Sequence, residues 1–412
     1  MRRDEAVDAG ELAGTALGEL AEVARDVHRA VAGRIFDAVG ALTAGASEPV
    51  RLTHDGIAGL VYAATRVGVR YGPVAGGLAT AALRPRTAPS LHDEPRGRAV
   101  LGAVSGFWGD RIAAAQPALA PELRLRLHGH PLRRLAGNLA ADAADADVTG
   151  RLVVFLHGLC ETDRVWSYAA EARWGDPTAT YGSRLRAEAG WTPVYANFNT
   201  GVHISANARE LADRLDEVVA QWPVEVEEIA LVGHSLGGLV ARGAAEHAVD
   251  TGLPWSGRLR QIVSLGTPHH GAPLERFANW GSHQLARLPE TRPFADWLNR
   301  RSVGIKDLRY GALTEDDWTG FDPDELLTDR CGVPRLLPGV TYAAVSATLS
   351  RDPHGPFAHD LLVTHRSAHG AGTTRAIPFE ADRTMHVGGG RHHFDLLADP
   401  QIYAQLLAWL EK

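Results

Sequence analysis

Lysine and cysteine are scarce in this sequence of 412 residues, and its 42 lysines and arginines are fewer than its 49 aspartates and glutamates. Lys306 and Lys412 are its only lysines, and the formal net charge at pH 7 is −7. Nucleic-acid binding needs a basic face, so this charge argues against nucleic acid as the main partner. The two cysteines, Cys160 and Cys331, are too few for a disulfide framework, and we expect two separate thiols.

Long hydrophobic runs are also missing. The first ten residues include Asp4, Glu5 and Asp8, which is not the pattern of a secretory signal peptide. The most apolar segment, residues 56–83, is interrupted by arginines, glycines and a proline, so we expect no transmembrane helix. These absences favour a cytoplasmic protein. Hydrophobic residues still make up 45% of the chain, which is enough for a sizeable core.

The first 115 residues are rich in alanine and have helical periodicity. Their pattern predicts helices at residues 12–27, 27–39 and 55–83. The Pro- and Arg-rich stretch 84–96 predicts a linker, and residues 110–115 a short helix. We therefore expect an N-terminal helical extension over residues 1–115 that packs on the rest of the chain. Oligomerisation and membrane-surface contact are alternatives, and the lack of a strong basic face disfavours the membrane.

From residue 123 onward, short apolar runs alternate with helical patterns. Residues 123–127 alternate apolar and polar side chains, which predicts a half-exposed strand, and a return strand can follow the turn at residues 128–131. Apolar runs predict further strands at 152–156, 192–196, 229–232, 261–265, 340–345 and 376–380. Helical patterns occupy residues 204–219, 236–249 and 402–410. Such alternation implies an α/β fold with a mostly parallel sheet covered by helices on both faces.

Two stretches interrupt this alternation. Residues 139–150 are rich in alanine and aspartate, which predicts an exposed loop. Residues 272–338 lie between two predicted strands and contain only helical fragments. A connection of that length is usually a lid or a binding loop. We therefore expect a second domain over residues 116–412, with a lid-like helical insertion at residues 272–338.

Gly233-His-Ser-Leu-Gly237 follows the strand at 229–232 directly and opens a helix. A serine hydroxyl is a poor nucleophile unless it is held exposed beside a base, and a sharp strand-to-helix turn exposes it. Glycines at positions 233 and 237 remove Cβ atoms that would clash in such a turn. The helix N-terminus also directs free N–H groups toward a developing oxyanion. The motif therefore predicts Ser235 as a nucleophile.

Two further motifs give the chain a family resemblance. With Phe155-Leu-His-Gly-Leu159 upstream and Leu265-Gly-Thr-Pro-His-His-Gly271 downstream, the serine motif resembles bacterial lipases and esterases of the α/β-hydrolase superfamily. It also resembles the GPI-inositol-deacylase-like branch. The resemblance covers about residues 120–412 and implies the α/β-hydrolase fold. It further implies an oxyanion hole made by the backbone amides of Leu159 and Leu236.

The family order of serine, acid and histidine places the base near the end of the chain. A glycine-rich loop there contains two adjacent histidines. The run His393-Phe-Asp-Leu-Leu matches the family pattern, which favours His393 over His392, with His386 as a third candidate.

The acid is expected after the strand at 340–345. His359-Asp-Leu-Leu-Val363 resembles the family's acid motif, although the family usually has glycine or asparagine where His359 stands. This resemblance favours Asp360 as the acid, with Asp352 as the alternative.

These residues imply a serine hydrolase that cleaves carboxylic esters with an apolar acyl chain through an acyl-enzyme. An acyltransferase on the same fold and a non-catalytic binding module are the alternatives. We expect a small-molecule or lipid ester as substrate, no cofactor and no metal. Side-chain contacts to substrate are expected at Trp166 and His157, although ordinary packing explains each of them as well.

Overall fold

The computed structural model describes all residues except 44–46, 133–146, 334, 356 and 373–374. The chain divides into two compact units, which are described separately. The first comprises residues 1–101, 111–120 and 277–301, and the second comprises residues 102–110, 121–276 and 302–412. Most of the exposed loop expected at 139–150 lies outside the described residues.

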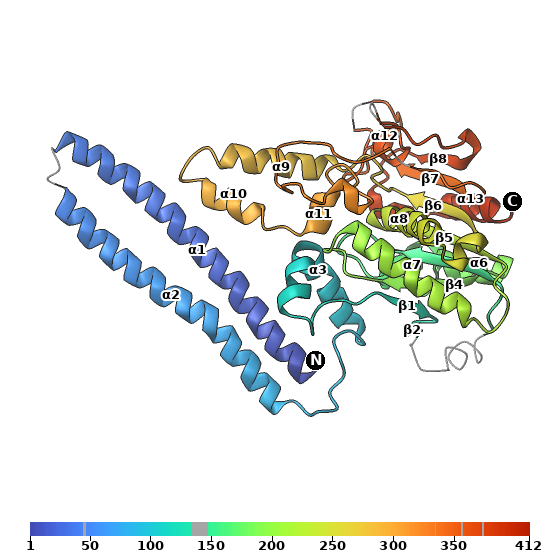
Figure 1. Ribbon diagram of the computed structural model, residues 1–412, viewed down its shortest axis with the longest axis horizontal. Coiled ribbons are helices and arrows are strands. Elements are labelled where there is room, and N and C mark those ends of the chain that lie inside the picture. The colour runs from blue at the N-terminus through green and yellow to red at the C-terminus, as the bar shows by residue number, and fades with distance from the viewer. Residues whose placement is uncertain (44–46, 133–146, 334, 356, 373–374) are drawn as a thin grey trace. The chain divides into compact units, whose positions relative to one another are not determined.

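Two long helices, α1 (Arg3–Leu42) and α2 (Glu48–Leu83), pack along each other in the first unit (Figure 1). The prediction of separate helices at residues 12–27 and 27–39 is wrong, because α1 runs through both. No proline occurs within α1, and a glycine costs a helix only about 1 kcal/mol, so no residue ends the helix there. The short helix expected at residues 110–115 is the end of a longer one, α3 (Pro95–Ala115).

Facing glycines let α1 and α2 approach closely. A Cβ atom added to Gly77 would lie 2.5 Å from the carbonyl oxygen of Ala6 and 3.1 Å from the Cα atom of Gly10.

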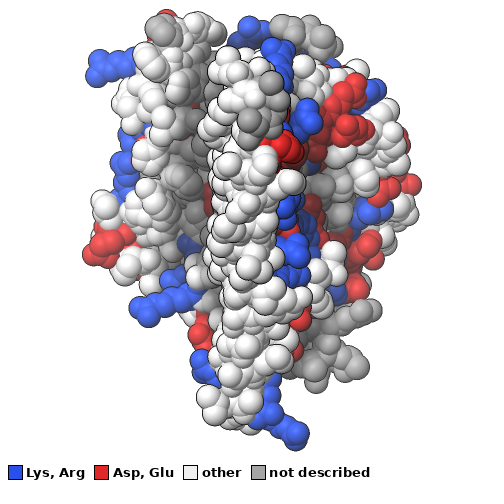
Figure 2. All heavy atoms as spheres, turned by 90° about the vertical axis from the view of Figure 1, so that its left-hand side faces the viewer, with Lys and Arg blue, Asp and Glu red and all other residues white. Residues whose placement is uncertain are grey.

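Many large apolar side chains of α1 and α2 are exposed, such as Leu60 and Leu52, and Figure 2 shows mainly uncharged residues over this surface. Within the described part of the chain, none of the helices has both the length and the apolarity needed to span a membrane.

The second unit is built on a mostly parallel sheet, as the sequence predicts. Its described strands follow the order β2-β1-β4-β3-β5-β6-β7-β8. β1 pairs antiparallel with β2 and β4, and the other neighbours are parallel. The strands are β1 (Arg124–Leu127), β2 (His130–Pro131), β3 (Arg151–Leu156), β4 (Thr192–Asn197), β5 (Glu228–His234), β6 (Leu259–Leu265), β7 (Thr341–Ala347) and β8 (Thr384–Val387).

Helices cover both faces of this sheet (Figure 1). Alternate side chains of β3 point to opposite faces, so Val154 belongs to one buried apolar cluster and Phe155 to the other. The first cluster includes residues of α7 (Ile204–Ala220) and α8 (Leu236–Thr251), and the second includes residues of α6 (Tyr181–Ala189) and α13 (Pro400–Leu410). The other described helices of this unit are α5 (Ala170–Trp174), α11 (Val303–Asp307) and α12 (His365–Ala368). α9 (Pro273–Leu285) continues from this unit into the first, and α10 (Arg292–Leu298) belongs to the first unit.

The last strand differs from its prediction. The sequence places it at residues 376–380, but that stretch makes only an isolated bridge at Ala376, and β8 lies at Thr384–Val387. Pro378 cannot donate a hydrogen bond to a sheet ladder, which explains why residues 376–380 do not form a strand. β8 has only one fully buried side chain, Val387, so it lacks the continuous apolar run that predicts the inner strands.

Three histidines surround one hydroxyl at the end of β7. Ser346 Oγ lies 2.8 Å from His365 Nδ1, 2.9 Å from His369 Nε2 and 3.1 Å from His386 Nδ1. Burial, followed by the charges of the neighbouring histidines, lowers the pKa of His365 to about 4. Burial is also the main cause that lowers the pKa values of His369 and His386. The surroundings of this cluster therefore favour the neutral form of all three imidazoles.

We predict that Gly77→Ala destabilises the packing of α1 on α2. The added methyl group meets backbone atoms that cannot move independently, so the free energy of unfolding should fall by about 1–3 kcal/mol. Thermal denaturation checks this prediction. Gly72→Ala on the same helix is the matched control, because a methyl group there meets nothing within 4 Å. That control should raise stability slightly, and an equal loss in both variants would contradict the packing account.

We further predict that the protein loses stability in acid through the Ser346 cluster. The pKa of His365 is lower in the folded chain than its ordinary 6.5. Its stabilising contribution is therefore complete above pH 6.5 and is lost as the pH falls toward 4. Melting temperatures between pH 7.5 and 4.5 should show a shallower acid decline in His365→Asn than in the wild type. His247→Asn, outside the cluster, should follow the wild-type curve, and parallel curves for all three proteins would contradict the prediction.

Candidate active site

Ser235 stands at the turn between β5 and α8. Its backbone angles are φ 53° and ψ −125°, a conformation that residues with a Cβ atom rarely adopt. Strain of this kind persists only where the surrounding structure enforces it. The Ser235 N–H donates to the carbonyl oxygen of Leu265 at 2.8 Å, and the Gly238 N–H donates to the Ser235 carbonyl oxygen at 3.1 Å. The turn thus holds a partly accessible serine, 8% exposed, at the end of the sheet.

The glycines of the motif leave room for this turn. A Cβ atom on Gly233 would collide with the backbone of Gly238, and one on Gly237 would lie 2.6 Å from the carbonyl oxygen of His157. A Cβ atom on Gly238 would collide with Thr267. The turn is therefore crowded by its own helix, by the backbone after β3 and by the Thr267 side chain after β6, as the motif's glycines predict.

His393 and Asp360 form a buried pair although 33 residues separate them. His393 Nδ1 donates to Asp360 Oδ2 at 2.6 Å, and both side chains are 2% exposed. Asp360 Oδ1 accepts the N–H groups of Leu362 at 3.0 Å and Val363 at 2.8 Å. His393 Nε2 is buried and makes no hydrogen bond within the described part of the chain. That nitrogen is the one a general base would present to a serine hydroxyl.

The pair lies next to the serine turn. The ring of His234, which precedes Ser235, is 4.6 Å from the ring of His393 between centroids. His393 Cε1 would lie 3.0 Å from a Cβ atom on Gly266, the residue after the carbonyl that accepts from Ser235. The structure therefore brings the predicted nucleophile, base and acid together where the inner strands end. Ser235 and His393 make no direct hydrogen bond with each other.

The two predicted oxyanion donors border the same place. Leu236 is the first residue of α8, and the first amides of a helix have no partner within it. Leu159 follows Gly158, where a Cβ atom would lie 2.8 Å from the Cβ atom of Ser235. The loop that carries the Leu159 amide therefore runs directly beside the nucleophile.

Glu161 and His234 form a second buried acid–base pair, which the sequence analysis missed. His234 Nδ1 lies 3.0 Å from Glu161 Oε2, and the His234 side chain is fully buried. Burial disfavours both charges, yet the mutual attraction holds the pKa of Glu161 below its usual value and that of His234 above it. The only sequence signal for this pair is that Glu161 lies two residues beyond Leu159. Its partner, His234, is 73 residues away in the sequence.

Two predicted substrate contacts need correction. The His157 ring is fully buried, with Nδ1 2.9 Å from the carbonyl oxygen of Gly158 and Nε2 accepting the Phe198 N–H at 3.2 Å. Burial lowers the pKa of His157, which fits a neutral ring that shapes the loop. Trp166 is 1% exposed and packs edge-on against Phe155 in the core. Neither side chain offers a surface to substrate in this structure.

The alternative acid and bases lie elsewhere. Asp352 is exposed and accepts the His354 N–H in a local turn. His392 is partly exposed and lies 3.5 Å from Asp395, and His386 belongs to the Ser346 cluster. Within the described residues, no group of three or more His, Cys, Asp or Glu side chains is arranged to hold a metal ion.

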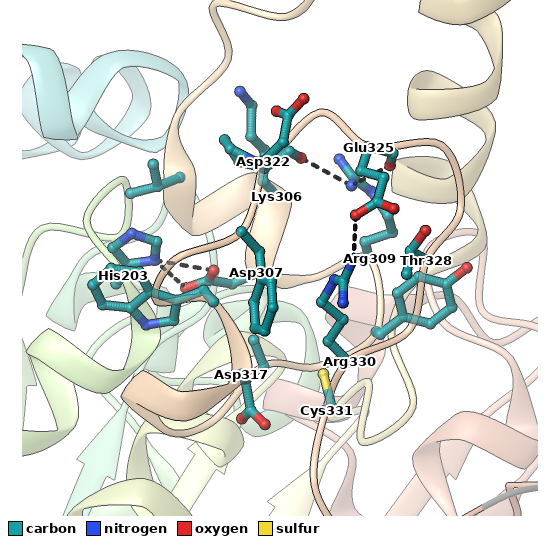
Figure 3. A pocket seen from close by; sticks show the side chains of 16 residues that line it. His203, Lys306, Asp307, Arg309, Asp317, Asp322, Glu325, Thr328, Arg330 and Cys331 are labelled. Carbon is teal, nitrogen blue, oxygen red and sulfur yellow. Dashed lines mark hydrogen bonds and ion pairs between the residues drawn. The ribbon is translucent and has the colours of Figure 1, made fainter.

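A separate cavity of about 130 Å³ has charged walls (Figure 3). Two ion pairs lie among its lining residues, His203 with Asp307 at 3.1 Å and Arg330 with Glu325 at 2.6 Å. The His203 ring also stacks on Trp318 at 3.7 Å. None of the triad candidates lines this cavity.

Part of the chain is similar to a known protein family. Residues 147–319 match the PGAP1-like alpha/beta domain family. No curated protein matches the chain. A lipase from Bacillus licheniformis in its mature form is 18% identical, with 63% of this chain and 91% of that chain covered and a TM-score of 0.38. An esterase from Pyrobaculum calidifontis is 15% identical, with 78% and 90% covered and a TM-score of 0.38. Residues 147–319 are therefore similar to the PGAP1-like alpha/beta domain family, and the strand order is that of an α/β fold with a mostly parallel sheet.

Proposed function

We propose that the protein is a serine hydrolase that cleaves carboxylic esters through an acyl-enzyme. The observation that carries the proposal is the buried Asp360–His393 pair, whose unbonded Nε2 atom lies beside the strained serine turn. Serine needs an oriented base to become a nucleophile, and a carboxylate on the far ring nitrogen orients that base.

The proposed reaction follows from these positions. Asp360 accepts a hydrogen bond from the Nδ1–H group of His393, so Nε2 is the nitrogen with a free lone pair. Nε2 takes the hydroxyl proton of Ser235 as the oxygen attacks the ester carbonyl. The amides of Leu159 and Leu236 hold the negative charge that develops on the carbonyl oxygen. His393 then returns its proton to the departing alcohol, and water releases the acyl group by the reverse sequence.

Apolar side chains beside the acid and the base support an apolar acyl group. Leu361, directly after Asp360, is 62% exposed, and Phe394, directly after His393, is 36% exposed. The ring of Tyr168 lies 5.7 Å from the ring of Phe394. Apolar surface that the fold leaves open next to a reactive group is available to bury an acyl chain.

Replacing each member of the triad should abolish ester hydrolysis. Ser235→Ala and His393→Gln should lower kcat/KM by roughly 10⁴-fold or more, and Asp360→Asn by roughly 10³- to 10⁴-fold. Hydrolysis of p-nitrophenyl butyrate measures the loss, and a fluorophosphonate should label the wild type at Ser235. The matched controls are His392→Gln and Asp352→Asn, which should stay within about twofold of the wild type. A wild type that neither hydrolyses esters nor reacts with the fluorophosphonate would favour a binding module instead.

The apolar neighbours predict a preference for longer acyl chains. Across p-nitrophenyl esters from acetate to decanoate, kcat/KM should rise by roughly 4- to 15-fold between C2 and C8, which corresponds to full burial of one or two of the added CH₂ groups at about 0.8 kcal/mol each. In Phe394→Ala this rise should be smaller, while activity on the acetate ester is largely kept. A monotonic fall in kcat/KM from C2 onward would contradict the assignment of these side chains to the acyl site.

A further inference from the structure

We propose that Glu161 is a positioning residue that ties the oxyanion loop, the serine turn and the backbone of the catalytic base together through His234. This inference rests on the proposed function, because it assigns Glu161 a part in the same reaction. The carboxylate contacts no reacting atom in the mechanism above, so its effect must pass through the residues that it holds.

The first connection is inside the oxyanion loop. Glu161 Oε2 accepts the N–H of Gly158 at 2.6 Å, while the Glu161 N–H donates back to the Gly158 carbonyl oxygen at 3.3 Å. These two bonds close a tight turn in which Cys160 has a positive φ of 63°. Leu159 lies within this closed turn, so the direction of its amide depends on the Glu161 side chain. Hydrogen bonds to a charged acceptor are among the stronger ones in proteins.

The second connection runs through His234 to the base. His234 Nδ1 bonds to Glu161 Oε2 at 3.0 Å, and His234 Nε2 lies 3.3 Å from the carbonyl oxygen of His393. Both acceptors are oxygens, so the imidazole must donate from both nitrogens, which only its protonated form can do. A protonated His234 therefore links Glu161 to the backbone of His393, directly beside Ser235.

The paired charges also protect the oxyanion site. A lone carboxylate beside Leu159 would oppose the negative charge that develops on the substrate oxygen. The positive charge of His234 offsets that of Glu161, and both side chains are shielded from water, with 8% of Glu161 and none of His234 exposed. Removal of one partner leaves a buried, unpaired charge, which costs more than removal of both.

The test compares Glu161→Gln, His234→Gln and the double variant in the full chain. Glu161→Gln keeps the shape of the side chain but loses the charge, and it should lower kcat by roughly 10- to 100-fold with KM within about threefold. His234→Gln should lower kcat further, because Glu161 remains charged and unpaired. The double variant should recover part of that loss relative to His234→Gln, which is the sign of two residues that act through each other.

The matched control is Glu275→Gln. Glu275 is even more buried than Glu161, at 3% side-chain exposure against 8%, and pairs with Arg309 at 3.0 Å. This variant should lower the melting temperature without changing kcat by more than about twofold. Melting temperatures of all variants separate a folding defect from a catalytic one. Glu161→Asp, which keeps the charge, should restore part of the kcat lost in Glu161→Gln if any of these proteins is too unstable to assay.

Histidine ¹⁵N NMR gives a readout that does not depend on turnover. The wild type should keep one doubly protonated imidazole at pH 8, and Glu161→Gln should lose it. An unchanged kcat in Glu161→Gln, an equal kcat loss in Glu275→Gln or a neutral His234 in the wild type would each overturn the inference while leaving the proposed function intact. A wild type that neither hydrolyses esters nor labels at Ser235 would instead overturn the proposed function.

Discussion

The strained turn at Ser235 is the constraint on which the rest of the second unit depends. A residue with a Cβ atom at a φ of 53° costs about 1–3 kcal/mol, so its neighbours must over-determine the turn. They do so from two sides, through the hydrogen bond from Ser235 to Leu265 on β6 and through glycines that admit the backbone of β3. The parallel strands thus fix the position of Ser235 without a contribution from His393 or Asp360.

Two buried acid–base pairs lie next to each other at this turn. Each pair stabilises a buried carboxylate, but the two pairs do so with different hydrogen bonds. A single buried charge is costly, whereas a paired carboxylate that also accepts backbone amides is tolerated. Asp360 uses two amides of its own loop and leaves His393 one unbonded nitrogen. Glu161 uses the Gly158 amide and leaves His234 none, because both of its nitrogens are engaged. The first pair is therefore poised for proton transfer, and the second suits a structural link.

Local signals explain what could be predicted from the sequence. Apolar runs predict the inner strands because each of these strands is buried on both faces. The glycine motif predicts the turn because five consecutive residues contain all the glycines that the turn requires. The candidates Ser235, His393 and Asp360 follow from motifs of similar length. The Glu161–His234 pair has no such motif, since its members come from different loops and only the folded sheet brings them together. β8 escaped prediction for a related reason, because a half-exposed edge strand such as residues 384–387 has no continuous apolar run.

The corrected substrate contacts show which part of the site is left to recognise substrate. The side chains of His157 and Trp166 belong to the core, so under the proposed function the loop after β3 contributes its backbone rather than these side chains. The apolar side chains that remain accessible beside the triad, Leu361 and Phe394, are immediate neighbours of the acid and the base. Under the proposed function, the residues that shape the acyl site and those that transfer the proton lie on the same two loops. A side-chain truncation such as Phe394→Ala should then change acyl preference without moving the proton-transfer pair, because it leaves in place the backbone that carries that pair.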